Sequence, residues 1–440
     1  MPQRTSRRDF LQTTAATGIG FWVAGGVQAQ ESKSPNEKIQ IACVGCGGKG
    51  SSDAADSGNH GVVVAICDVD EKTLNAAAAR FPKAKKYFDF RKMLEEMEKS
   101  IDAVTVSTPD HTHAAPTLMA MRMGKHAFVQ KPLTRTIYEA RLLGQVAREK
   151  KVATEMGNQG TAMPGLRRAA ALLRKGALGK VSEVHVWTNR PIWPQGGQRP
   201  KEAPVPEHLK WDLWIGPAPM RPYGMGYHPF SWRGWWDFGT GALGDMACHT
   251  FNMPFAGLDL RDPVSVQAET SGHNKDSYPK WSIIEFQFPA NDWRGPVKVV
   301  WYDGGKRPSK ELLDGKDPVG SGCLVIGEKG KIYSPNDYGA EFEVLGGAQM
   351  PEVEFTKSPG HFEEWIRAIK GGPAAMSNFP DYAGPLTETI LLGNLAVWAA
   401  SEPGKGKKIE WDAKQLKATN APEVQHIVKP TYRKGYTLDV

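Results

Sequence analysis

A glycine-rich turn near the start of the chain has the spacing of a loop that binds the phosphates of a dinucleotide. Gly45, Gly47 and Gly50 form G-x-G-x-x-G, and Gly48 is a fourth glycine in the same turn. In this motif the first glycine permits a tight turn, the second lets the backbone approach a pyrophosphate, and the third lets helix and strand pack closely. The sequence therefore predicts a nucleotide-binding loop, although a glycine turn without a ligand would have the same spacing.

An aspartate follows at the distance expected for a contact with the ribose of such a nucleotide. Asp68 stands 18 residues after Gly50, directly after an apolar stretch over 62–67, which is where a carboxylate meets the ribose hydroxyls. The next basic residue is Lys72. Because a carboxylate without a neighbouring cation repels the 2′-phosphate of NADP, the sequence favours NAD as the cofactor.

Three further residues have the chemistry to move a proton beside a nicotinamide. Asp245 and His249 are four residues apart, so on a helix they share one face. Histidine titrates near neutrality and suits a base that takes the hydroxyl proton of a carbinol while hydride leaves. Lys131 can donate to the reacting oxygen and stabilise negative charge there. The alternative for Asp245 and His249 is a surface pair without a catalytic role.

Alternating strands and helices are predicted to position these groups. The pattern indicates strands at 38–44, 62–67, 101–108, 126–129 and 152–155, with helices at 114–123 and 137–150. This alternation predicts a doubly wound parallel sheet over 38–158, preceded by a linker over 30–37, with ligands at the carboxyl ends of the strands.

The remaining chain predicts a second, α+β domain over 159–401. Strands at 181–187, 281–288 and 297–302 and helices at 362–369 and 386–400 are expected. The alternation in these strands suits a large open, mostly antiparallel sheet with one buried face. Its other face is available for subunit packing, so we expect a homo-oligomer. Residues 402–440 are expected to form a C-terminal surface arm.

Ten of the 14 tryptophans lie between residues 187 and 301. Aromatic faces cover the C–H face of a sugar, while arginine and asparagine bond its hydroxyls or a carboxylate. The same residues are also enriched in cores and oligomer interfaces, and we assign Trp211 and Trp214 to the core. The residues expected to bind substrate are Asn158, Trp187, Arg190, Trp232, Arg233 and Trp236.

Four segments together resemble the Gfo/Idh/MocA family of oxidoreductases. They are the glycine turn with Asp68, T-P-D-H-T-H at 108–113, Q-K-P at 130–132, and G-A-L-G-D-M-A-C-H at 241–249. The last three are similar to the family's T-P-N-x-x-H, E-K-P and G-G-x-x-x-D-x-x-x-H. The resemblance implies a Rossmann domain followed by an open-sheet domain, and hydride chemistry on sugars or polyols. It places Lys131, Asp245 and His249 at the nicotinamide, and implies further cofactor contacts from Thr108, Pro109, His113 and Gln130.

Three positions depart from the family pattern. Gln130 replaces the glutamate of E-K-P, Asp110 replaces asparagine, and Ala242 replaces the second glycine of the last motif. Gln130 removes a charge beside Lys131, which puts the pKa and the partner of this lysine in question.

The first residues resemble an export signal. Arg7 and Arg8 precede Phe-Leu and a mild apolar stretch, and Val27-Gln-Ala29 offers a small-residue cleavage site. The pattern predicts a twin-arginine signal over 1–29, so that the protein is exported folded to the periplasm by the twin-arginine machinery. An ordinary secretory signal and a chance arginine pair are the alternatives.

Composition excludes several other classes. The formal net charge is +7 without a basic stripe, so nucleic acid is not an expected partner. Cys43-Val-Gly-Cys46 spells a redox motif, but it overlaps the glycine turn. His111, His113, Asp245 and His249 have metal-ligand side chains, yet the two pairs are far apart in the sequence, and no metal is expected.

An exported dinucleotide enzyme has no cofactor pool to draw on, so the cofactor must travel inside the folded protein and be restored in place. The expected activity is an oxidoreductase that oxidises one sugar, polyol or glycoside and reduces another. The alternative is a glycoside hydrolase that oxidises a hydroxyl transiently, eliminates the aglycone, adds water and re-reduces. A periplasmic sugar-binding protein without catalysis is a further alternative.

Overall fold

A computed structural model describes residues 38–438. The expected signal over 1–29 and the expected linker over 30–37 lie outside the described residues. In the part that is described, no helix combines the length and the apolar character needed to cross a membrane.

The first domain is a six-stranded parallel sheet in the order β3-β2-β1-β4-β5-β6. Its strands are β1 (Gln40–Val44), β2 (Val62–Cys67), β3 (Lys85–Tyr87), β4 (Ala103–Val106), β5 (His126–Val129) and β6 (Thr154–Met156). The helices between them are α2 (Lys49–His60), α3 (Glu71–Arg80), α4 (Phe90–Met97), α5 (Ala114–Arg122) and α6 (Ile137–Lys150). The predicted doubly wound sheet is confirmed.

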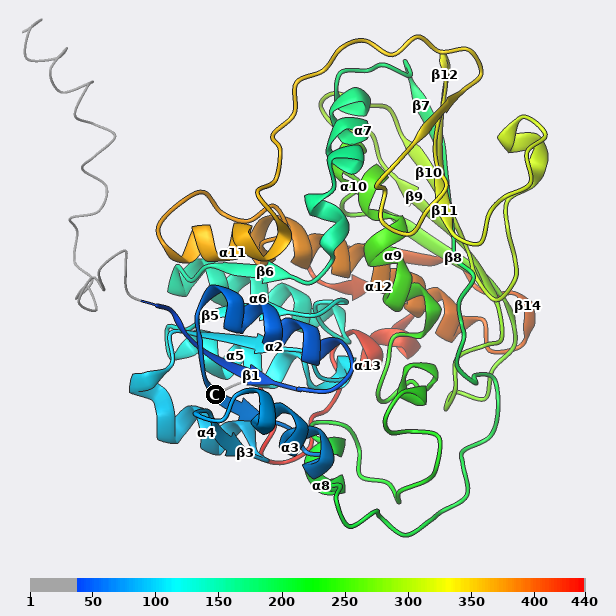
Figure 1. Ribbon diagram of the computed structural model, residues 1–440. Coiled ribbons are helices and arrows are strands. Elements are labelled where there is room, and N and C mark those ends of the chain that lie inside the picture. The colour runs from blue at the N-terminus through cyan, green and yellow to red at the C-terminus, as the bar shows by residue number, and fades with distance from the viewer. Residues whose placement is uncertain (1–37, 439–440) are drawn as a thin grey trace, which may run out of the picture. The chain divides into compact units, whose positions relative to one another are not determined.

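Helices cover both faces of this sheet (Figure 1). Alternate residues of β1 belong to two separate clusters: Ala42 packs with side chains of α4, α5 and α6, and Ile41 packs with those of α2 and α3. Trp365 of α11 (His361–Ile369) joins the second cluster. A helix from late in the sequence therefore completes the first domain.

Local sequence sets the start of α6, which follows the loop that carries Lys131. The Thr136 hydroxyl accepts from the backbone N–H of Glu139 at 3.3 Å, and the Glu139 carboxylate accepts from the backbone N–H of Thr136 at 3.0 Å. This reciprocal capping box satisfies two N–H groups that a helix start leaves unpaired. The helix ends at Lys150, and the capping residue Lys151 has a left-handed φ of 53°.

The second domain is built on a ten-stranded sheet in the order β13-β12-β11-β7-β10-β9-β8-β15-β16, with β14 also paired to β8. Its strands are β7 (Val181–Trp187), β8 (Ser265–Ser271), β9 (Ser282–Phe288), β10 (Val297–Tyr302), β11 (Gly322–Gly327), β12 (Gly330–Ser334), β13 (Glu343–Leu345), β14 (Pro403–Lys405), β15 (Ile409–Asp412) and β16 (Lys417–Ala418). Only the β7–β10 pairing is parallel among the described strands of this sheet. The mostly antiparallel open sheet is therefore confirmed.

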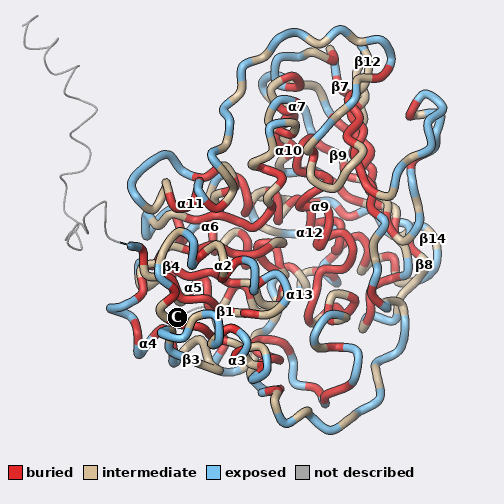
Figure 2. The backbone as a smooth tube through the Cα atoms, in the orientation of Figure 1, coloured by how far each residue is buried: buried red, intermediate tan, exposed pale blue. Residues whose placement is uncertain are grey.

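Helices pack on one face of this sheet. They are α7 (Pro164–Arg174), α9 (Gly241–Thr250), α10 (Asn252–Leu258) and α12 (Gly384–Ala399). Their apolar side chains share one cluster with the inward residues of β9, such as Ile284 and Phe286. Figure 2 shows buried residues concentrated in both sheets and in α9 and α12, while exposed residues follow the outer loops. This packing holds α9, the helix with Asp245 and His249, in the core.

The expected surface arm over 402–440 is wrong. The segment supplies β14 and β15, which pair with β8. The side chains of Ile409, Val424 and Val428 are no more than 1% exposed. Short strands and isolated apolar residues carry little periodic signal, which is why the pattern looked like a loop.

Replacing Ile409 with Ala is expected to lower the free energy of unfolding by about 2–5 kcal/mol, the range for emptying a buried aliphatic site. Glu410 on the same strand is exposed, so Glu410→Ala is the matched control and should change the stability by less than about 0.5 kcal/mol. Denaturant unfolding measures both. Equal small effects would contradict the packed role of this segment.

Candidate active site

The glycine turn is held against the neighbouring strand by close backbone approaches. Gly45 has a φ of +81°, and a Cβ there would lie 2.7 Å from the carbonyl carbon of Ser107. A Cβ on Gly50 would lie 2.1 Å from the carbonyl oxygen of Gly45. Side chains at these two positions would therefore open the turn between β1 and α2.

Asp68 is bound into the glycine turn. Its carboxylate accepts from the backbone N–H of Cys46 at 2.8 Å and from that of Asp70 at 2.9 Å. Burial raises the pKa of Asp68 to about 6, against these two hydrogen bonds, which lower it. Each carboxylate oxygen has further acceptor capacity, so both are able to accept from ribose hydroxyls.

The surrounding residues fit a nicotinamide dinucleotide. Helix α2 begins after Gly48 without a side-chain cap, which suits a helix start that faces phosphate. The buried hydroxyl of Thr108, beside Gly45, has no hydrogen-bond partner among the described residues. A bound nucleotide would have Asp68, the glycine turn and Thr108 as its first contacts.

The cysteine pair in the turn is not a redox site. The Cys46 thiol lies 3.8 Å from the carbonyl oxygen of Cys43 and 3.7 Å from that of Cys67. Burial raises the pKa of the Cys43 thiol to about 11. Because the thiolate is the reactive form, these buried thiols are inert, and all five cysteines of the chain are free.

Lys131, Asp245 and Arg233 meet at one carboxylate. The Lys131 ammonium donates to Asp245 Oδ1 at 2.7 Å and to the Asp245 backbone oxygen at 2.8 Å. The Arg233 guanidinium donates to the same Oδ1 at 3.2 Å. Burial alone would raise the pKa of Asp245, but Lys131 and Arg233 outweigh it and hold this pKa well below its usual range. The structure thus brings the two domains together at Asp245.

His249 lies one turn further along α9 and is 3% exposed. Burial, reinforced by the charge of Lys131, holds the pKa of His249 well below its ordinary value. Its Nδ1 has no hydrogen-bond partner in the described part of the chain, and the edge of its ring meets Tyr338 at 4.9 Å between centroids. His249 is therefore neutral at pH 7 and able to accept a proton.

The two histidines at 111 and 113 hold the backbone together. The His113 ring lies between the carbonyl oxygens of Thr108 at 2.7 Å and Pro132 at 2.8 Å, so it fixes the loop that carries Lys131. The His111 ring lies between those of Trp214 and Phe238. Within residues 38–438, no group of three or more His, Cys, Asp or Glu side chains is arranged to hold a metal ion.

Gln130 is paired with a carboxylate that the sequence analysis missed. Its side-chain amide donates to Asp53 Oδ2 at 2.9 Å, and the Ser107 hydroxyl donates to the same oxygen at 2.7 Å. Lys49 lies 2.5 Å from Asp53 Oδ1. Asp53 is 1% exposed. The sequence did offer one signal for Asp53, because a charged residue stands on the buried face of α2 between Gly50 and Ala54.

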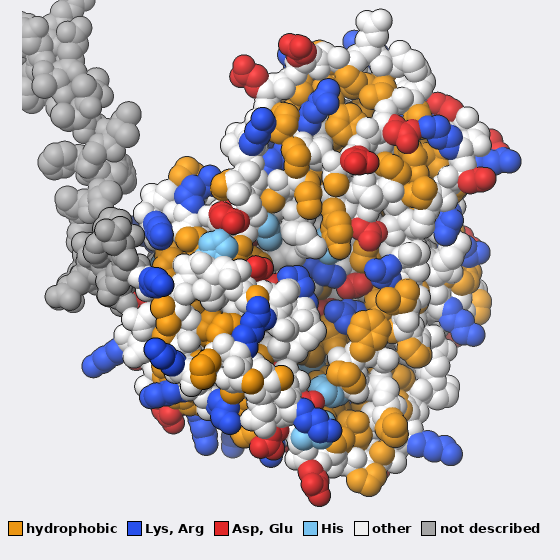
Figure 3. Space-filling view, in the orientation of Figure 1, with side chains coloured by type: hydrophobic (Ala, Val, Ile, Leu, Met, Phe, Trp, Pro, Cys, Tyr) orange, Lys and Arg blue, Asp and Glu red, His pale blue; other side chains and the backbone are white. Residues whose placement is uncertain are grey.

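Among the expected substrate residues, Arg233 and Trp232 lie together. The Arg233 guanidinium lies 4.1 Å above the Trp232 ring and 5.4 Å from that of Phe230. Arg190 follows β7 and bonds the side chain of Asn189. In the space-filling view, Lys and Arg side chains gather near the centre of the molecular face together with acidic and histidine side chains (Figure 3). Sugar binding by these residues stays a prediction.

Trp187 and Trp236 do not line the site, and that expectation is wrong. Trp187 is fully buried, donates to the Val319 carbonyl at 2.8 Å and stacks on Tyr333. Trp236 is 7% exposed and stacks on Tyr278 at 3.8 Å. Both rings fill core space. Trp211 and Trp214 are stacked and buried, as predicted.

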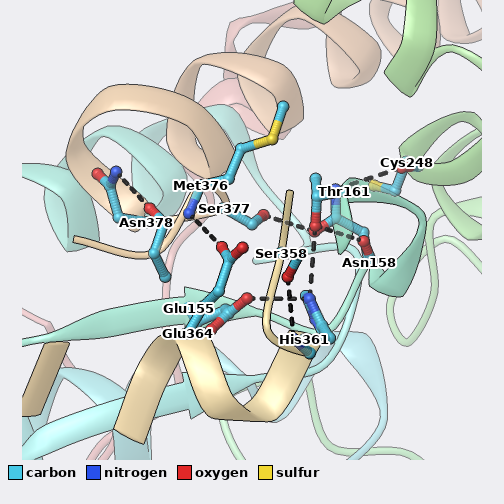
Figure 4. A network of polar contacts seen from close by, with 12 residues as sticks. Glu155, Asn158, Thr161, Cys248, Ser358, His361, Glu364, Met376, Ser377 and Asn378 are labelled. Carbon is cyan, nitrogen blue, oxygen red and sulfur yellow. Dashed lines mark hydrogen bonds and ion pairs between the residues drawn. The ribbon is translucent and has the colours of Figure 1, made fainter. Parts of the chain in front are cut away.

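Asn158 makes structural hydrogen bonds next to the site. Its Oδ1 accepts from the Ser377 hydroxyl at 2.5 Å, and its amide donates to the Cys248 carbonyl at 3.5 Å (Figure 4). The side chain is fully buried and exposes no surface to a substrate, so the expected substrate contact is wrong. Asn158 instead ties β6 to α9 beside His249.

A buried ion pair lies in the same network. His361 Nδ1 is 2.9 Å from Glu155 Oε1 (Figure 4). Burial would lower the pKa of His361, but Glu155 outweighs it and raises this pKa. Because unpaired buried charges are costly, this pair fixes α11 against β6.

The fold and the glycine turn define a two-domain dinucleotide-binding protein, and comparison with known proteins identifies its family. Residues 39–158 match "Oxidoreductase family, NAD-binding Rossmann fold", and residues 170–438 match "Oxidoreductase family, C-terminal alpha/beta domain" of the same family. The chain belongs to the Gfo/Idh/MocA oxidoreductase family. Its first domain is an NAD-binding Rossmann domain, and the expected cofactor is confirmed.

Two relatives are similar to parts of the chain. A glycosyl hydrolase family 109 protein of Solibacter usitatus is 34% identical over 154 residues, which cover 31% of this chain and 35% of the relative. Levoglucosan dehydrogenase of Pseudarthrobacter phenanthrenivorans is 24% identical over 188 residues, which cover 43% of this chain and 40% of the relative. The matched segments span less than half of either relative.

Among solved structures, the WlbA dehydrogenase of Bordetella pertussis, in complex with NADH and UDP-GlcNAcA, has the same fold. Its TM-score is 0.58 at 17% identity, over 86% of this chain and 99% of that chain.

Gln130→Glu is expected to place a second carboxylate against Asp53 and to lower the free energy of unfolding by about 1–3 kcal/mol, the cost of unsatisfied buried polar groups. The double variant Asp53→Asn with Gln130→Glu restores one amide and one carboxylate, and should recover most of the loss. Denaturant unfolding of both variants measures the coupling. Additive losses in the double variant would contradict the pairing.

Proposed function

We propose that the protein is an NAD-dependent oxidoreductase that moves hydride between a tightly held nicotinamide cofactor and the carbinol or carbonyl of a sugar, polyol or glycoside. The observation that carries this proposal is the contact of Lys131 with Asp245, one helical turn from His249, whose Nδ1 has no hydrogen-bond partner among the described residues. The levoglucosan dehydrogenase relative acts on a sugar derivative, which supports the substrate class.

Each residue has a distinct task in this reaction. The cofactor, when bound, supplies the hydride acceptor. An ammonium has three N–H donors, and two of those on Lys131 contact Asp245, so one is left for the substrate oxygen. His249 takes the hydroxyl proton as the oxygen becomes a carbonyl, and returns it when the direction reverses. Asp245 does not transfer a proton, since its carboxyl stays ionised; it positions Lys131.

Replacing His249 with Ala is expected to lower turnover by about 10²–10⁴-fold, the contribution of a general acid–base. The measurement is the rate of hydride transfer across a panel of sugars and polyols. Bound NAD should be retained, because Asp68, the glycine turn and Thr108 supply the first contacts of the nucleotide.

His426→Ala is the matched control, since His426 is exposed. Nearly full activity of the His249→Ala variant would refute the assignment.

The low pKa of His249 means that its ring stays neutral as the pH falls through 6.5. The turnover of the unaltered protein should therefore not fall at that pH.

A glycoside hydrolase is the second candidate, favoured by the similarity to a glycosyl hydrolase family 109 protein. In that reaction His249 would take the proton of a hydroxyl while its hydride passes to the bound cofactor, the aglycone would leave by elimination from the resulting carbonyl compound, and water would add. The same hydride and proton would then return to the carbonyl, with no net redox change. Release of aglycone from an aryl glycoside without added NAD distinguishes it. No hydride exchange and no hydrolysis would support a sugar-binding protein instead.

Export by the twin-arginine route to the periplasm is also part of this proposal. The arginine pair at 7 and 8 supports it. Replacing both residues with lysine should abolish periplasmic accumulation, measured by fractionation and immunoblotting, because the receptor reads the pair. Unchanged accumulation would point to another export route.

Assembly into a homo-oligomer through the open sheet completes the proposal. The residues of β9 that point away from the helices, such as Ile283 and Gln287, are half-buried in the single chain. Light scattering on the mature protein tests this, and a monomer mass would contradict it.

A further inference from the structure

A long segment of the second domain packs against the first. Residues 203–238, here called the strap, lie between β7 and α9 and include the short helix α8 (Trp211–Ile215). Figure 1 shows α8 beside α3 and β3, away from the strands of the second sheet. The strap is attached to the first domain at two places.

The first attachment follows β2, directly after Asp68. The backbone N–H of Glu71 donates to the His208 carbonyl at 2.8 Å, and that of Lys210 donates to the Val69 carbonyl at 2.9 Å. His208 Nδ1 lies 3.0 Å from Asp70 Oδ1. Backbone pairing and a hydrogen bond to the Asp70 carboxylate therefore hold the strap beside Asp68.

The second attachment follows β4. The His111 ring lies 2.9 Å from the Trp214 carbonyl and 3.2 Å from that of Phe238. Arg433 donates to the Gly216 carbonyl at 2.8 Å, which fixes the end of α8 from the C-terminal segment. The strap is thus held beside Thr108 and Pro109 as well.

The strap has its own apolar core, which extends into the nucleotide-binding domain. Ten buried side chains form it: Leu209, Trp211, Trp214, Ile215, Ala218, Tyr223, Tyr227, Trp232, Trp235 and Phe238. Val69, the residue after Asp68, packs against this cluster. Separation of the strap from the first domain would expose Val69 and the parts of Trp214 and Phe238 that the His111 ring contacts, which opposes opening.

The geometry points to the strap as the outer wall of the adenosine subsite, and as the element that keeps the dinucleotide from exchanging. The adenosine half of a dinucleotide in a Rossmann domain lies across the carboxyl ends of the strands, and the two attachments flank those ends at Asp68 and Thr108. This inference rests on the proposed use of NAD. It adds residues outside the Rossmann domain to the nucleotide site.

The test is the rate at which bound dinucleotide exchanges with isotopically labelled NAD⁺. The full-length mature protein is purified without added nucleotide, its dinucleotide is counted after denaturation, and exchange is followed by mass spectrometry. His208→Ala removes the contact with Asp70 and should accelerate exchange about tenfold, the factor expected for a lost hydrogen bond to a charged group.

His60→Ala is the matched control. His60 lies 3.2 Å from Glu363, and its side chain is exposed to a similar degree to that of His208, but it is on α2, outside the strap. Equal exchange rates in the unaltered protein and both variants would overturn the strap inference while leaving the proposed function intact. A protein that neither holds nor binds NAD would overturn the proposed function itself.

Hydrogen exchange on the unaltered protein keeps the inference testable if His208→Ala does not fold. The amides of Glu71 and Lys210, which donate across the strap contact, should exchange more slowly with dinucleotide bound than after its removal. Equal protection in both states would overturn the inference.

Discussion

A carboxylate that is removed from water needs compensating charge, and Asp245 obtains it from two separate parts of the chain. Lys131 comes from the loop after β5, and Arg233 comes from the strap. Loss of either cation would leave the buried charge less well compensated. The Lys131 contact therefore resists separation of the domains, and the Arg233 contact holds the strap to α9. Because α9 is packed in the core, fixing Asp245 also fixes His249 one turn away. The site geometry depends on this one buried charge.

A second buried carboxylate explains how the chain tolerates glutamine in the Q-K-P segment. Asp53 lies on the helix behind the glycine turn and accepts from Gln130 and Ser107. A glutamate at 130 would face Asp53 directly, and two carboxylates at hydrogen-bond distance repel each other. The negative charge that a glutamate at position 130 would carry therefore lies on α2 instead, at Asp53. Lys131 is paired with a different carboxylate, that of Asp245. Gln130 is consistent with an intact site.

Strongly periodic segments were predictable from the sequence. The bounds of β2, β5, α6, β7 and β10 agree with the pattern, because each strand holds a run of at least three buried residues and α6 begins with a capping box. The motifs also singled out Lys131 and Asp245, which the structure brings into contact, and His249 on the same helix as Asp245. Their catalytic roles stay predictions. The parallel order of the first sheet follows from the same βαβ rhythm.

Long-range packing was not predictable in this way. Trp187 points to the opposite side of β7 from Val184 and Val186, where it meets Leu324 and Tyr333 in a small separate core. Nothing in its neighbourhood in the sequence indicates that this face is covered. The pairing of Asp70 with His208 spans 138 residues, and no periodic pattern encodes such a contact. Asp53 was missed because its partners come from three different loops and helices.

The position of Arg233 in the strap links retention of the dinucleotide to the chemistry. Arg233 belongs to the strap and contacts Asp245, so the element that we propose as the wall of the adenosine subsite also compensates the buried carboxylate. In the proposed function, an enclosed cofactor regains its starting oxidation state within each cycle, from a second sugar or from the product of the first step. Both cycles benefit from a strap that stays closed, because no reduced cofactor is then lost between the two half-reactions.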